Sequence, residues 1–207
     1  MVRRFALPLL VVLAAVLGGL LLLPRMGGPA EGSTEVRFVR EMIQHHAQAV
    51  DMALRVRERS RDEQLRTLAL DITLSQQEQI GQMRGWLTLW GRPWGGEGMS
   101  AEHASMMGMA TQAEVQALSD LGAAQSEVRF LQLMTRHHQG ALAMVAPALA
   151  PSVRPEVQAL ARQIQAAQTT EVTLMTRLLR ERARSRSPRR PPVTVTWTAC
   201  STDTDPG

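Results

Sequence analysis

Four of the five histidines in the chain form two adjacent pairs, and each pair lies in the same short motif. The motif M-x-x-H-H-x-x-A-x-x-M occurs at 42–52 and again, 92 residues later, at 134–144. At ~100° per residue, a helix places the imidazoles, the thioethers and the small alanine of one copy on one face. Imidazole and thioether donors without thiolate favour Cu(I), Ag(I) or Cu(II). The side chains concerned are Met42, His45, His46 and Met52 in the first copy and Met134, His137, His138 and Met144 in the second.

Packing alone is the competing interpretation of this pattern. Methionine at helical spacing is more often a core residue than a ligand. Adjacent histidines on an apolar face are harder to explain, because burying an imidazole without partners is costly. Gln76 and Gln168, which lie on the apolar stripes of the helices that follow, could satisfy them by hydrogen bonding. The residues therefore allow two interpretations of the histidine pairs: they are hydrogen-bonded core residues, or they form a metal or proton-linked site. Gln76 and Gln168 would be the supporting residues.

Further soft side chains lie outside the two motifs. The glycine-rich stretch 92–110 carries four methionines and the fifth histidine, and it is either a second soft-metal region or an oxidation-prone loop. A di-iron carboxylate site is not favoured, because Glu41 stands four residues before His45 while the matching position is Leu133. The additional candidate ligands are Met83, Met175, Met99, His103, Met106, Met107 and Met109.

The repeat extends well beyond the motif. At the constant offset of 92, residues 34–91 and 126–183 share 16 identities in 58 positions, and the identities fall at helical spacing. We interpret this as two copies of a helical hairpin that buries its apolar face against its twin. The Met-rich connection 92–125 is long enough to cross a bundle whose 26-residue helices span roughly 39 Å. The predicted fold is all-α, a ferritin-like four-helix bundle built from two repeated hairpins.

Local signals give the expected helix limits. The first helix is expected at about 34–59, and Ser60 to Glu63 is expected to act as the capping box of the second, which ends near Gly91. Thr111 is expected to cap a short helix that ends near Gly122. The last two long helices are expected at about 124–149 and from Pro155 to about 184.

The two ends of the chain differ from the bundle at 34–184. Residues 5–23 carry no charge and span roughly 28 Å on a helix, so 1–24 is predicted to be an uncleaved membrane anchor. A cleaved signal peptide is the alternative, and in both cases the bundle is exported, either anchored facing the periplasm or exterior, or secreted. Residues 25–33 are predicted to be a linker and 185–207 a disordered tail.

Charge excludes one class of partner. The sequence pI is near 11.0, but within 34–182 there are 16 Arg and 16 Asp plus Glu, so the excess of positive charge lies at the ends. We therefore expect no nucleic-acid partner. The single Cys200 lies in the tail, which excludes an internal disulfide framework.

The doubled phrase Phe-x-x-x-Met-x-x-His-His-x-x-Ala-x-x-Met, at 38–52 and 130–144, resembles a family of exported bacterial proteins of unknown function that includes the copper-binding protein CopM. The Met-rich connection and the Gln-to-Met stripes ending at Leu87 and Leu179 fit the same family. The resemblance implies a ferritin-like bundle outside the cytoplasm, associated with copper binding and resistance, with the eight His and Met residues of the two motifs as ligands. Many members carry an aromatic–acid pair before the second motif, whereas this chain has Ala123-Ala124-Gln125-Ser126.

The leading functional hypothesis is a non-enzymatic copper binder, with silver as a second soft ion, that buffers or transfers metal outside the cytoplasm. A ferritin-like metalloenzyme or oxidase is the first alternative. A pH-responsive interaction module, whose paired histidines titrate between about pH 5 and 7, is the second. The expected partners are a metal ion and, through residues 5–23, a membrane, while the sequence indicates no particular protein partner.

Overall fold

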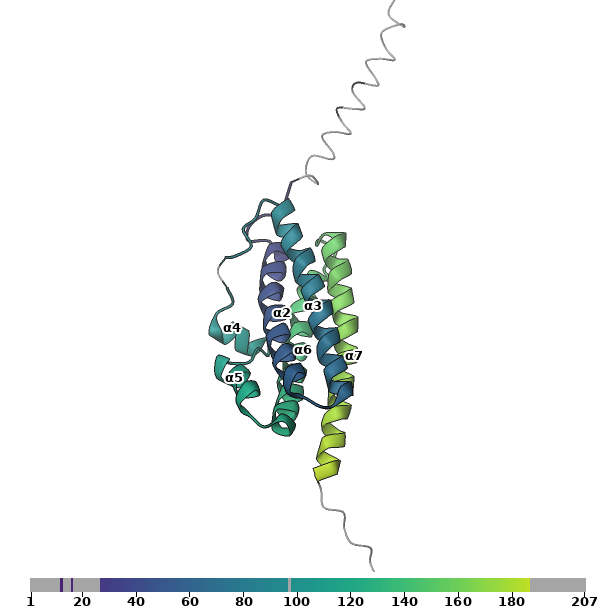
Figure 1. The fold of residues 1–207 in the computed structure, drawn as a ribbon. Helices are drawn as coiled ribbons and strands as arrows, with labels where there is room; N and C mark the ends of the chain where they lie inside the picture. Colours follow the sequence, from purple (N-terminus) through teal and green to yellow (C-terminus); the bar gives the residue numbers. More distant parts are fainter. Residues whose placement is uncertain (1–11, 13–15, 17–26, 97, 187–207) are drawn as a thin grey trace, which may run out of the picture.

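The computed structural model describes residues 12, 16, 27–96 and 98–186, and within these residues all regular structure is helical. The predicted all-α class is thereby confirmed. Four long helices form the body of the molecule, and two short ones lie in the connection between the second and third of them (Figure 1). The long helices are α2 (Thr34–Arg59), α3 (Glu63–Leu89), α6 (Ala123–Ala148) and α7 (Pro155–Arg186), and the short ones are α4 (Ala101–Met106) and α5 (Gln112–Asp120).

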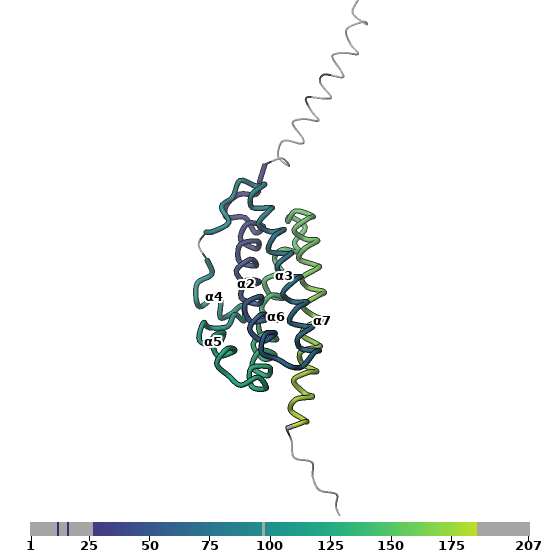
Figure 2. The backbone as a smooth tube through the Cα atoms, viewed as in Figure 1, coloured from purple at the N-terminus to yellow at the C-terminus, as the bar shows by residue number. Residues whose placement is uncertain are grey.

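The long helices pack as two hairpins that meet along α2 and α6. Helix α2 packs on α3, α6 packs on α7, and α2 and α6 contact each other along the centre. Met42 and Met144 share one core cluster, while Met52 and Met134 share the other, so α2 and α6 run antiparallel. Figure 2 shows the four long helices side by side, with α4 and α5 together on the flank beside α2. The two histidine pairs therefore approach each other from facing helices.

Helix α2 shows why these residues become helical. Ser33 caps its start by accepting the N–H of Val36, and buried residues then recur every three or four positions, as an amphipathic helix requires. The expected capping role of Ser60 is wrong. Asp62 caps α3 by accepting the N–H of Leu65, and Ser60 donates its hydroxyl to Glu127 instead. Asp is as good an N-cap as Ser, which leaves the Ser60 hydroxyl free for this contact between hairpins.

The connection crosses the bundle from end to end along α2. Side chains spaced along α2 bond to it in chain order, from Arg40 at the Pro93 carbonyl to Arg59 at the Leu121 carbonyl. The glycines of 92–110 predict a loop without helix, but α4 forms there, and Ser100 caps it by accepting the N–H of His103. The predicted Thr111 capping box is present at the start of α5.

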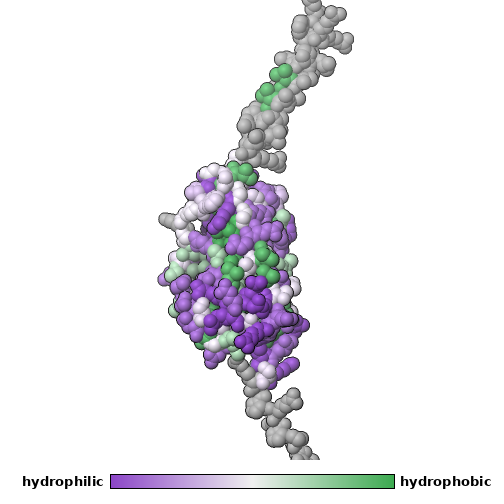
Figure 3. Space-filling model, in the orientation of Figure 1, coloured by the Kyte–Doolittle hydropathy of each residue, from purple (hydrophilic) through white to green (hydrophobic). Residues whose placement is uncertain are grey.

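The predicted membrane anchor at 5–23 lies outside the described residues, except for Val12 and Val16, and the predicted tail lies outside them beyond residue 186. Among the helices that the structure describes, none is long and apolar enough to cross a bilayer. The face of the bundle drawn in Figure 3 is made mostly of hydrophilic residues, with apolar residues in small patches between them.

Candidate metal centre

The two histidine pairs lie inside the bundle where α2 faces α6. All four imidazole side chains have 0% of their surface exposed. The rings of His45 and His137 are stacked, with centroids 3.6 Å apart and 30° between their planes. The ring centroids of His137 and His138 lie 6.2 Å apart. The tertiary fold therefore brings both copies of the sequence motif into one buried imidazole cluster.

Three of the four histidines are held in the same tautomer. In each, Nε2 lies within hydrogen-bond distance of an oxygen that can only accept, so Nε2 carries the proton and the lone pair lies on Nδ1. Histidines that bind metals are usually held this way, by a carboxylate or carbonyl oxygen that accepts the N–H of the other ring nitrogen. The three bonds are His45 to the Met107 carbonyl (3.0 Å), His46 to Gln79 Oε1 (2.7 Å) and His138 to Glu171 Oε2 (2.6 Å).

The other ring nitrogens of these histidines have no hydrogen-bond partner. Nδ1 of His45, His46 and His138 and both ring nitrogens of His137 are buried without a hydrogen-bond partner. Each buried unsatisfied polar group costs on the order of 1–3 kcal/mol of stability. Five such nitrogens in one cluster are an unusual concentration, because most buried polar atoms in folded proteins are satisfied. The cluster therefore contains buried imidazole nitrogens that make no hydrogen bond within the protein.

Burial keeps the imidazoles of His45, His46 and His137 neutral. It lowers the pKa of His45 to about 4 and, with the neighbouring His45, lowers the pKa of His46 to about 3. Burial, followed by the nearby imidazoles, also holds the pKa of His137 well below its usual range. A neutral imidazole is the form that binds metal, so no proton has to be displaced from these rings near pH 7.

Six methionines, the four of the two motifs and one each from α3 and α7, lie three in each core cluster on either side of the imidazoles. Met42, Met83 and Met144 belong to the first cluster, and Met52, Met134 and Met175 belong to the second. Five of the six have no exposed surface, and Met144 has 8%. Thioether sulfur is thus available toward both ends of the imidazole cluster.

The predicted ligands of the connection divide into two groups. Met99 and Met107 pack against the first core cluster, whereas Met106 is 70% exposed. Met109 lines a separate cleft beside Arg136. The His103 ring lies near the surface, with its Nε2 3.6 Å from Glu41 Oε2. The structure therefore brings two of the four methionines of this stretch to the bundle core.

The hydrogen-bond partners of the second histidine in each pair differ from those predicted. Gln76 and Gln168 are buried, but their Oε1 atoms have no partner, and Gln79 and Glu171 bond the histidines instead. Gln79 lies three residues beyond Gln76, and Glu171 three beyond Gln168, so both positions face the same side of their helices. Gln79 and Glu171 are themselves 92 residues apart, but a search for identities overlooks a pair that differs.

The donor set fits a soft ion of low coordination number. Among the described residues, no three His, Cys, Asp or Glu side chains are grouped closely enough to form a conventional metal site. What the cluster offers is neutral imidazole nitrogen flanked by thioether sulfur, which suits monovalent copper or silver. Glu171 is the one carboxylate hydrogen-bonded to a core histidine in the part of the chain that the structure describes. A di-iron centre would need several carboxylates there.

Within the described residues, the protein is exclusively helical, and a buried cluster of paired histidines lies at its centre. The profile of the family described as "Domain of unknown function (DUF305)" matches residues 35–179, and the chain belongs to this family. A comparison with curated proteins finds no match.

Solved structures agree with this assignment. A DUF305 fragment from Deinococcus radiodurans is 52% identical, with 74% of this chain and 99% of that chain covered and a TM-score of 0.68. A DUF305 protein of Streptomyces coelicolor, assigned as secreted, is 41% identical, with 74% and 96% covered and a TM-score of 0.69. CopM in its Cu(II)-bound form is 27% identical, with 72% and 96% covered and a TM-score of 0.61. The chain thus has the fold of the two DUF305 structures and of CopM.

Proposed function

We propose that this protein binds Cu(I), with Ag(I) as its chemical analogue, in the buried histidine cluster, and that it buffers or transfers the ion outside the cytoplasm. The observation that carries the proposal is the common tautomer of His45, His46 and His138. Each has its Nε2–H fixed by an oxygen and its Nδ1 lone pair buried without a partner. Hydrogen-bonded core histidines would have no reason to share this arrangement, whereas ligands require it.

The burial of the cluster favours a monovalent ion. Moving a charge from water into a protein interior costs several kcal/mol per ion even after relaxation, and the electrostatic cost rises with the charge. Cu(I) and Ag(I) carry one charge and accept imidazole and thioether donors, whereas Cu(II) prefers a tetragonal set of nitrogen and oxygen ligands. We therefore assign the resident ion as Cu(I) rather than Cu(II).

The proposed ligands are the imidazoles of the two pairs, with the motif thioethers as further donors. Gln79 and Glu171 take the supporting role first expected of Gln76 and Gln168. The proposed ligands are His45, His46, His137, His138, Met42, Met52, Met134 and Met144.

The comparisons support this proposal. CopM has been solved with Cu(I), Cu(II) and Ag bound. The secreted assignment of the Streptomyces relative and the apolar residues 5–23 support export, with an anchor at 1–24 as the proposed form. Two hairpins joined by a connection that crosses the bundle support a ferritin-like topology.

One observation favours a second candidate function. Three neutral buried histidines make the stability of the metal-free bundle fall in acid, as a pH-responsive module would require. Copper binding is preferred because a pH switch has no use for the fixed Nδ1 lone pairs or the flanking thioethers.

A competition titration under reducing, anaerobic conditions tests the proposal. The parent chain should remove Cu(I) from the chromophoric chelator bicinchoninate, and changing His45 and His46, or separately His137 and His138, to Leu should each weaken binding. The matched control is His103→Leu, because His103 is the one histidine outside the buried cluster. A parent that takes no Cu(I) from the chelator, or binding lost only in the His103 variant, would overturn the proposal.

A further inference from the structure

The middle part of the crossover connection lies over the imidazole cluster. We call residues 99–110 the strap. It lies across α2 and α6, and its Met107 carbonyl accepts the Nε2–H of His45. A Cβ at Gly140 of α6 would collide with that carbonyl, so only glycine allows the strap to lie this deep. The strap is therefore part of the wall of the cluster.

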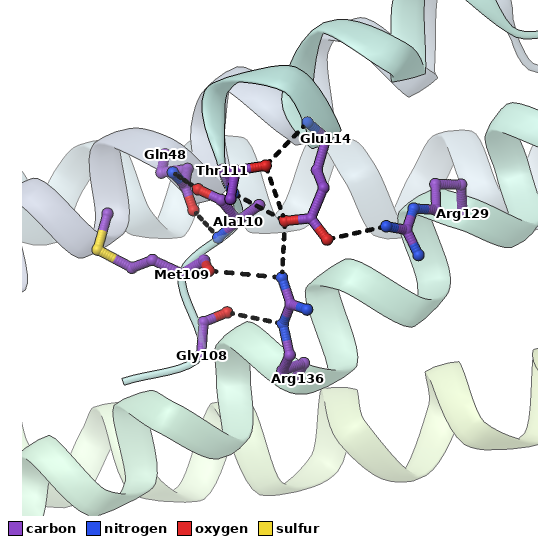
Figure 4. Close-up of polar contacts among 8 residues, drawn as sticks. All are labelled: Gln48, Gly108, Met109, Ala110, Thr111, Glu114, Arg129 and Arg136. Atoms are coloured by element: carbon purple, nitrogen blue, oxygen red, sulfur yellow. Dashed lines mark hydrogen bonds and ion pairs between the residues drawn. The ribbon is translucent and has the colours of Figure 1, made fainter. Parts of the chain in front are cut away.

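Side chains of α2 and α6 hold the strap in place (Figure 4). Gln48 bonds both backbone groups of Ala110, accepting its N–H at 2.7 Å and donating to its carbonyl at 2.9 Å. Arg136 donates to the carbonyls of Gly108 and Met109, at 3.3 and 3.4 Å. Gln48 and Gly140 occupy positions 92 residues apart. The two copies of the motif thus differ at this position, because Gln48 of the first copy bonds the strap and Gly140 of the second makes room for it.

An open cleft of about 420 Å³ lies on one side of the strap. Its walls come from α2, the strap and α6, and they include three thioethers, of Met99, Met107 and Met144, and the imidazole of His103. Met144 is only 8% exposed and belongs to the same core cluster as Met42. The Met107 side chain lines the cleft while its carbonyl holds His45. Soft donors thus continue from the molecular surface to the buried cluster.

The cleft on the other side of the strap differs in chemistry. Its volume is about 500 Å³, but Met109 is its single thioether. The guanidinium of Arg136 also lines it and is paired with Glu114 at 3.1 Å (Figure 4). The first cleft is also lined by one arginine and one glutamate, Arg37 and Glu41, so charge does not separate the two openings. The number of soft donors does separate them, and it makes the first cleft the better route for a soft cation.

We propose that the cleft lined by Met99, Met107 and Met144 is the entrance through which a soft monovalent cation reaches the buried histidines. The ion is passed between thioethers, from Met99 at the surface to Met107 and Met144, and then to Nδ1 of the imidazoles. His103 adds a nitrogen donor at the mouth. This inference rests on the proposed function, but it concerns the rate of loading and not the final site.

Loading kinetics of the full chain test the entrance. Transfer of Cu(I) from its bicinchoninate complex is followed by stopped-flow absorbance with protein in excess, and affinity is measured separately at equilibrium. The variant M99L/M107L removes two thioethers of the cleft at nearly constant volume. We expect loading to slow by about tenfold or more with affinity within about twofold of the parent. The matched control, M106L/M109L, removes two thioethers of the strap outside the cleft and should load at the parental rate.

A steric variant makes the test independent of sulfur. Ala143 is exposed on α6 and lines the cleft, whereas Ala146 is exposed on the same helix but does not. Ala143→Trp should slow loading and Ala146→Trp should not. Equal rates for parent and both cleft variants would overturn the entrance, as would equal slowing by M106L/M109L. If M99L/M107L loses affinity without loading more slowly, the two thioethers are ligands of the final site. That result would also refute the entrance. Failure of the proposed function is seen separately, as a parent that holds no Cu(I) at equilibrium.

Discussion

Replacing His137 by Leu separates a metal ligand from a packing residue. His137 is fully buried, and neither ring nitrogen has a hydrogen-bond partner. At ~1–3 kcal/mol for each unsatisfied group, their removal should relieve about 2–6 kcal/mol. The different shape of Leu should cost roughly 1–3 kcal/mol in this packed core. The net effect of the two ranges runs from a loss of about 1 kcal/mol to a gain of about 5 kcal/mol, so at pH 7 the metal-free variant should be more stable than the parent, by about 2 kcal/mol at the midpoints.

His46→Leu is the matched control, because the change in volume and the burial are the same. His46 donates to Gln79, so its loss leaves the buried Gln79 Oε1 without a partner, at a cost of about 1–3 kcal/mol. It also removes one unsatisfied nitrogen, Nδ1, which relieves a similar amount, so His46→Leu should lose only the shape term of roughly 1–3 kcal/mol. Thermal unfolding measures both, at about 2–4 °C per kcal/mol for a chain of this size. With Ag(I) at 100 times its dissociation constant the parent should gain ~2.7 kcal/mol, and His137→Leu should gain less.

Two results would refute this reasoning. If metal-free His137→Leu loses as much stability as His46→Leu, the His137 imidazole has partners in solution and is a packing residue. If it keeps the full stabilisation by Ag(I), His137 is not a ligand.

Three further changes test other parts of the account. The pKa values of His45 and His46, about 4 and 3, lie below the ordinary value of 6.5, so between pH 6.5 and pH 4 only the unfolded chain takes up these protons. The stability of the bundle should therefore be full above pH 6.5 and fall toward pH 4, by up to about 1.4 kcal/mol per pH unit for each histidine. Thermal unfolding of metal-free protein at pH 7 and pH 5 measures this, and equal stability at the two would contradict it. Glu171→Gln should lower Cu(I) affinity by about 10- to 100-fold and Gln79→Glu should raise it, whereas a merely structural Glu171 predicts unchanged titrations. Changing Met42, Met52, Met134 and Met144 to Leu should cost less than ~1.5 kcal/mol each but weaken Cu(I) binding, and undiminished affinity would show that these thioethers are core only.

Periodicity and the 92-residue repeat were sufficient to predict the long helices and the packing of the two repeats against each other. The signals are local: the spacing of apolar residues sets each helix, and the offset places His45 opposite His137. The length of the connection was also enough to predict that it crosses the bundle. Its partners along α2 were not predictable, because the bonds of Gln48 to Ala110 depend on the depth at which the strap lies.

The supporting residues of the site were missed for a related reason. Gln76 and Gln168 were predicted because they lie on the apolar stripes of their helices, whereas the bonds to His46 and His138 come from Gln79 and Glu171. The difference between amide and carboxylate at these positions is a functional asymmetry that a count of identities cannot reveal. Helix α4 was missed because the glycines around it outweighed the Ser100 cap.

The central claim is that the Nδ1 lone pairs of the paired histidines bind a soft monovalent ion. Long-range proton–nitrogen NMR of the imidazole rings, recorded before and after one equivalent of Ag(I), tests it directly, with His103 as the internal reference outside the buried cluster. The account predicts Nε2-protonated tautomers for His45, His46 and His138 in the metal-free protein. It also predicts that Ag(I) shifts their Nδ1 resonances and leaves those of His103 where they were. Shifts confined to His103, or Nδ1-protonated rings in the metal-free protein, would contradict it.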